Sequence, residues 1–125
     1  MPEPEVLTGR RIVADPAAID AVAWPDGVRL VRIANDDLFA IGATGPVPVA
    51  DPHAIDEPES MFSGIWLDAG AVGEWVETNA DWHLPHGDGL SQGMVAALPV
   101  KILVAADRAL VMVPSSFAAE LGERL

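Results

Sequence analysis

The amino-acid sequence predicts an α+β protein, built as an antiparallel sheet with helices packed on one face. Three observations carry this prediction: short apolar runs typical of strands, an amphipathic helix pattern after Asp68, and turn signals between consecutive runs. The chain has 125 residues, of which 50% are hydrophobic, so it is long enough to bury one core. We therefore expect a single domain over 1–125.

Capping and turn residues place the elements of the first half. Asp15 is suited to cap a short helix that has Pro16 at its first position. Asn35-Asp36 is a turn signal between two strand-like runs, which predicts a β-hairpin. The expected segments are a flexible leader over 1–9, strands over 28–34 and 37–43, and an irregular acidic loop over 44–60.

The second half predicts the order β-α-β-β-α, a ferredoxin-like unit that lacks its last strand. Asp68 is suited to cap the first helix, in which Val72, Trp75 and Val76 form one apolar stripe. Ser115 or Ser116 is suited to cap the second. The expected segments are strands over 61–67, 93–104 with a break at its proline, and 109–113, and helices over 68–79 and 116–125.

Composition excludes several classes of function. The chain carries 19 acidic residues against 7 basic ones, a formal net charge of −12. Nucleic acids and anionic membranes bind Lys and Arg, so neither is an expected partner. The absence of cysteine excludes disulfides, thiolate catalysis and cysteine-ligated metals. No apolar run is long enough to cross a bilayer and no signal peptide pattern is present, so we expect a cytoplasmic protein.

The segment DWHLPHGDG, residues 81–89, raises the question of a metal site. His83 and His86 are three residues apart, but Pro85 between them disfavours a helix. One hypothesis is a small metal-dependent enzyme or metal-binding protein with His83, His86 and Asp88 as ligands. The other is a surface loop in which Trp82 and the two histidines contact a ligand or a partner.

Two residues of the predicted sheet are further candidates for a contact. Lys101 is the only lysine and lies in an apolar strand, where it points to solvent or meets an anion of a partner. Trp66 offers a large apolar surface for the core or for an interface. The acidic residues of the 44–60 loop stand among prolines, and we interpret them as solvated rather than catalytic.

Much of the chain, roughly 24–125, resembles a known family. The second half is similar to the latter part of sarcosine oxidase gamma subunits, which in turn resemble the folate-binding fold of the glycine-cleavage T-protein and YgfZ. The hairpin RLVRIANDDLFAIG is similar to a RIAPDEWLLLG segment of those proteins. The matching residues are Gly64-Ile65, the helix after Asp68, Gly93, Lys101, Ser116-Phe117-Ala118 and Leu121.

This resemblance implies an accessory subunit, not catalytic by itself, of a multi-subunit amine or N-methyl amino-acid oxidoreductase. Its partners would be the larger subunits of a hetero-oligomer. Flavin or folate would be bound by those subunits, and no cofactor by this chain alone. A second resemblance joins VRLVRIANDDLFAIGATGPVP to the opening of Rieske-type domains, but Gly45-Pro46 stands where Cys-Pro is expected. It implies at most a module without an iron–sulfur cluster.

Overall fold

The structure is a computed structural model that describes residues 3–125, and it confirms the α+β class. Seven strands form an antiparallel sheet in the order β2-β3-β1-β4-β7-β6-β5. None of the helices within residues 3–125 is long and apolar enough to cross a membrane. The elements are β1 (Glu5–Val13), α1 (Pro16–Asp20), β2 (Arg29–Ala34), β3 (Asp37–Ile41), β4 (Ile55–Asp68), α2 (Ala69–Asn79), β5 (Gly89–Val95), β6 (Leu98–Ala105), β7 (Arg108–Pro114), the 3-10 helix η1 (Ser115–Phe117) and α3 (Ala118–Arg124).

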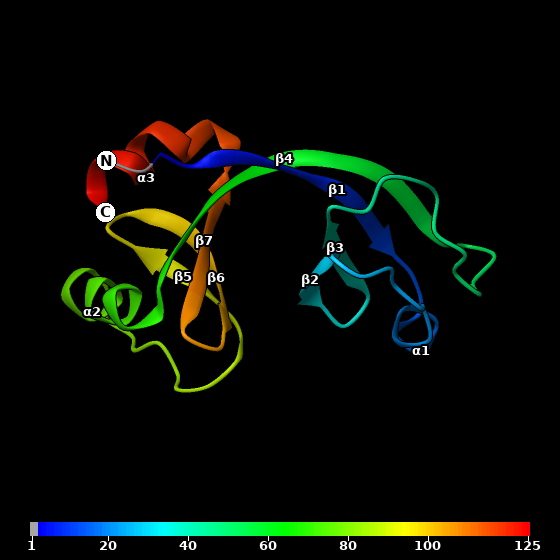
Figure 1. The fold of residues 1–125 in the computed structure, drawn as a ribbon, viewed down its shortest axis with the longest axis horizontal. Coiled ribbons are helices and arrows are strands. Elements are labelled where there is room, and N and C mark those ends of the chain that lie inside the picture. Colours follow the sequence, from blue (N-terminus) through cyan, green and yellow to red (C-terminus); the bar gives the residue numbers. More distant parts are fainter. Residues whose placement is uncertain (1–2) are drawn as a thin grey trace. The chain divides into compact units, whose positions relative to one another are not determined.

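The chain divides into two compact units. Leu7–Ser60 form one, here called the N-terminal unit, and Met61–Leu125 with the chain up to Val6 form the other, the C-terminal unit. β1 and β4 are each continuous strands that contribute residues to both units (Figure 1). The expectation of one folding domain stays a prediction.

In the C-terminal unit, both helices cover the same face of the strands. Residues 98, 100, 102 and 104 of β6 are buried and alternate with half-buried ones, as a period of two requires. Val72 and Val76 of α2 and Leu121 of α3 pack into the same core. The helix stripe expected from the sequence is therefore the buried face of α2.

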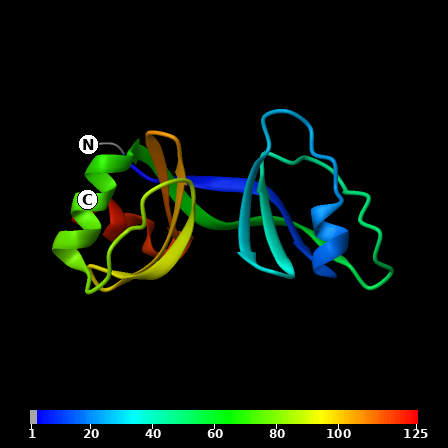
Figure 2. The ribbon, with the colours of Figure 1, turned by 90° about the horizontal axis from the view of Figure 1, so that it is seen from below.

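In the N-terminal unit, the predicted hairpin is present. β2 and β3 pair antiparallel around the turn at Asn35-Asp36, and β3 also pairs with β1. Ile12 and Leu38 from the strands pack against Ile19 of α1, with Trp24 at the edge of the cluster. Figure 2 shows α1 beside the strands of its unit.

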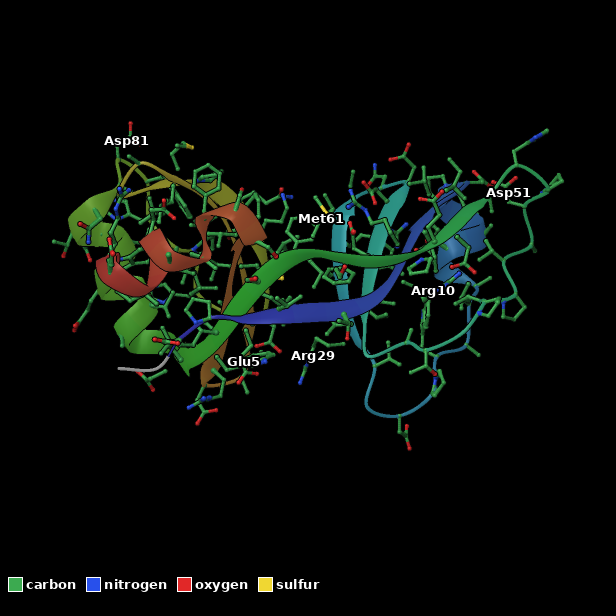
Figure 3. The ribbon with its side chains drawn as sticks, turned by 90° about the horizontal axis from the view of Figure 1, so that it is seen from above. Glu5, Arg10, Arg29, Asp51, Met61 and Asp81 are labelled. Carbon is green, nitrogen blue, oxygen red and sulfur yellow. The ribbon has the colours of Figure 1, made fainter. Side chains whose placement is uncertain are left out.

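Parts of two segments that were expected to be irregular are strands. β1 begins at Glu5, so residues 5–9 are not a flexible leader, and β4 begins at Ile55, so only the first part of 44–60 is irregular. The start of β4 was missed because it carries acidic side chains, and these are paired with arginines of β1, Arg10 (Figure 3) and Arg11. Arg10 Nε donates to Asp56 Oδ1 at 2.8 Å, and Arg11 Nη1 donates to Glu59 Oε1 at 2.8 Å.

The second half has one strand more than expected, in the order β-α-β-β-β-α. The predicted strand over 93–104 is two strands, β5 and β6, joined by a turn at Ala96-Ala97. Both alanines have positive φ, 49° and 62°, as a tight hairpin turn demands. Because β5, β6 and β7 pair in sequence and β7 pairs with β4, the unit is not ferredoxin-like.

The expected serine cap of the last helix is also wrong. Pro114 precedes η1 and Phe117 precedes α3, and neither position has a side-chain cap. Ser115 instead shares a hydrogen bond of 2.9 Å between its Oγ and Oγ of the buried Ser63. Its hydroxyl therefore satisfies a buried polar group of β4.

Candidate functional site

α2 begins where the sequence predicts and places two glutamates on its exposed side. Asp68 Oδ2 accepts a hydrogen bond from Ala71 N at 3.0 Å, which caps the helix. Since Val72 and Val76 face the core, Glu74 and Glu77, three residues apart, are left exposed. Residues at this spacing are neighbours on a helix surface.

The loop after α2 is fixed at both of its ends. At its start, Trp82 Nε1 donates to Met94 O at 3.0 Å, and the indole lies directly over Gly93. At its end, Asp88 Oδ1 accepts from Ala106 N at 2.9 Å. The residues between these two anchors, including both histidines, are presented beside α2.

A cavity lies between α2 and this loop. Its volume is about 520 Å³, within the range of small-ligand pockets. It combines small residues of α2, the two glutamates, the two histidines and an apolar wall. We call it the α2–loop cavity, and its lining residues are Ala69, Gly70, Gly73, Glu74, Glu77, His83, Leu84, Pro85, His86, Gly87 and Val104.

The charged groups of the α2–loop cavity are open to solvent. His83 Nδ1 lies 4.0 Å from Glu77 Oε1, and these side chains are 82% and 70% exposed. Such an exposed pair contributes little to stability, about 0–1 kcal/mol when the imidazole is protonated. The arrangement is thus suited to meet a group from outside rather than to hold the fold together.

The structure separates the five predicted contact residues. His83 and His86 line the α2–loop cavity, whereas Trp82 is turned away from it onto Gly93. Lys101 and Trp66 lie on the sheet face opposite α2, since they alternate with core residues of β6 and β4. Lys101 Nζ donates to Gln92 Oε1 at 2.6 Å and lies 5.9 Å from the centre of the Phe62 ring.

The three residues of the metal hypothesis are used differently. Asp88 is bound to the backbone of the turn at Ala106, while His83 and His86 line the cavity. Within residues 3–125, no three His, Asp or Glu side chains are placed to share a metal ion. The geometry therefore offers no support for a metal centre at this loop.

Comparison with protein-family models, curated proteins and solved structures found no match.

The N-terminal unit holds a network of ion pairs that the sequence did not reveal. Arg11 donates hydrogen bonds to Asp37 through two nitrogens and to Glu59 through a third. These carboxylates raise the pKa of Arg11, and the hydrogen bonds to Asp37 have the largest effect. Arg10 pairs with Asp56, whose second oxygen accepts from Val47 N at 2.7 Å. Asp56 and Glu59, which the sequence indicated as solvated, are therefore paired within the fold.

Glu74 and Glu77 are the site residues that sequence reasoning missed. Their spacing of three predicts a shared helix face, and the apolar stripe at Val72 and Val76 predicts that this face is exposed. Those signals were available in the sequence. What the sequence could not supply is the position of the histidine loop against that same face.

Proposed function

We propose that this chain is a non-catalytic accessory subunit of a multi-subunit amine or N-methyl amino-acid oxidoreductase. It contacts its larger subunits through the α2–loop cavity and forms a hetero-oligomer with them in the cytoplasm. Flavin or folate is held by the larger subunits. The resemblance to sarcosine oxidase gamma subunits supports the class of complex, and the geometry of the cavity supports the position of the contact.

One observation carries the position of the contact. The loop that contains His83 and His86 is anchored by Trp82 and Asp88, yet the histidines themselves face an open cavity. A rigid support under exposed polar side chains lowers the entropy lost when a partner binds. The sequence also indicated this loop as a candidate for contact with a ligand or a partner.

Co-expression tests the proposal. The chain carries an affinity tag and is produced together with the large subunits of an amine oxidoreductase from its own genome. Native mass spectrometry of the purified material is expected to give one species that contains the chain, the larger subunits and flavin. Recovery of the chain alone, while the larger subunits assemble without it, would contradict the accessory role.

A matched pair of variants tests the surface. His83→Ala combined with His86→Ala is expected to weaken the complex about tenfold, a loss of about 1.4 kcal/mol that marks a real contact but is smaller than that of a dominant hot spot. His53→Ala removes the third histidine, which lies in the N-terminal unit, and is expected to leave the dissociation constant unchanged. An equal effect of both variants would place the contact elsewhere.

A further inference from the structure

From the charge and shape of the α2–loop cavity, we infer that it receives a lysine or arginine side chain of the partner protein. This inference rests on the proposed function for the existence of a partner, and it adds the chemistry that the partner presents. A long basic side chain has an apolar stem and a cationic head, so it needs a site with both characters.

The cavity has this double character. Leu84, Val104 and Ala69 form an apolar wall against which methylene groups can pack. Glu74 and Glu77 stand on the adjoining helix face, where their carboxylates can accept hydrogen bonds from an ammonium or guanidinium group. An anion would meet two negative charges in the same place.

The cations of this chain do not neutralise the two glutamates. Within residues 3–125, Glu74 has no ion-pair partner, and Glu77 has only His83 at 4.0 Å. The three Lys and Arg side chains of Met61–Leu125, the part of the chain that holds the cavity, form hydrogen bonds elsewhere: Lys101 to Gln92, Arg108 to Trp66 O and Arg124 to Ala96 O. A cation for this cavity is therefore expected from another molecule.

One feature of the cavity opposes a cation, the N-terminal end of α2. A helix N-terminus carries a partial positive charge of roughly half a unit. Asp68 already lies at that end, with its carboxylate on Ala71 N, and it offsets the partial charge. Glu74 and Glu77 add two full negative charges on the same helix, so the net charge that faces the cavity is negative.

The test uses the full chain labelled with ¹⁵N and two short peptides. Acetyl-Gly-Arg-Gly-amide carries the cation, and the peptide with citrulline in place of arginine has nearly the same shape without the charge. The arginine peptide is expected to shift amide signals of 69–77 and 83–87. Raising the salt to about 0.5 M, where the Debye length is only a few ångströms, is expected to reverse those shifts.

Variants assign the binding to the two carboxylates. Glu74→Gln combined with Glu77→Gln is expected to weaken arginine-peptide binding about fivefold, as two exposed ion pairs would. Glu123→Gln, on the exposed side of α3, removes a charge away from the cavity and is expected to have no effect. Because all three side chains are exposed, the variants are expected to fold as the natural chain does.

Several results would overturn the inference. They are an equal response to the citrulline peptide, shifts centred outside the cavity, or unchanged binding in the double glutamine variant. Tighter binding of free methylguanidinium than of the peptide would also overturn it, in favour of a small-molecule amine site. If the large subunits bind the double glutamine variant as tightly as the natural chain, this inference fails while the accessory role stands.

Discussion

Gly9 of β1 lies close to the backbone of β3. A Cβ atom built at this position would be 2.0 Å from the carbonyl oxygen of Ala40, which belongs to the backbone and cannot turn aside. Gly9→Ala is therefore expected to lower the free energy of unfolding by about 3 kcal/mol, the upper end for overpacking. Urea denaturation measures this loss. Gly45→Ala, with nothing within 4 Å, is the control and should stay within about 1 kcal/mol of the natural chain.

Ala97 holds a backbone conformation that favours glycine. Its φ of 62° is left-handed, and Ala96 before it has a φ of 49°. An L-residue in this region costs about 1–2 kcal/mol, and glycine avoids that cost. Glycine also raises the conformational entropy of the unfolded chain, which cancels part of the gain in stability. Ala97→Gly is therefore expected to stabilise the protein by about 1 kcal/mol in thermal or urea unfolding. A loss of stability would contradict the turn at this position.

At the scale of elements, α2 depends on its cap. Asp68→Ala leaves the Ala71 N–H without its side-chain acceptor and is expected to cost about 1 kcal/mol. Asp68→Ser keeps an oxygen in this position and should recover most of the loss. Equal destabilisation by the two variants would show that the carboxylate acts by some means other than capping.

The loop before β4 depends on Asp51, and this dependence is sensitive to pH. Asp51 accepts hydrogen bonds from the backbone N–H groups of Asp15 and His53, and these bonds lower its pKa. A group with a lowered pKa in the folded state stabilises it above the unfolded pKa of about 3.9, and this contribution disappears as the pH falls through the folded pKa.

Asp51→Asn is accordingly expected to be less stable than the natural chain near pH 6. The difference should shrink as the pH falls below the unfolded value of about 3.9 and then through the lowered pKa of the natural carboxyl. Urea midpoints for both proteins across this range provide the measurement. A difference that is the same at both ends of the range would mean that the charge of Asp51 plays no part.

For the whole molecule, the sequence predicted those elements that have a clear local signal. The β2–β3 hairpin follows from Asn35-Asp36, and α2 follows from Asp68 and its apolar stripe. The sequence did not predict the elements that depend on contacts between distant parts of the chain. The start of β1 lies in the predicted leader over 1–9, and it became visible as a strand only through its pairing with β3, about thirty residues further along the chain.

The candidate site divides in the same way. The histidine loop was recognised from its composition, but the role of Trp82 was not, because its position over Gly93 joins residues eleven apart. The turn between β5 and β6 was hidden for a different reason. Alanine at positive φ is no turn signal, since its side chain disfavours the conformation that Ala96 and Ala97 adopt.

The most direct test of the account is the dissociation constant between this chain and the larger oxidoreductase subunits. Measured by isothermal titration calorimetry, it is expected to rise about tenfold for His83→Ala combined with His86→Ala and to stay unchanged for His53→Ala. Failure of the natural chain to bind those subunits at all would contradict the proposed function.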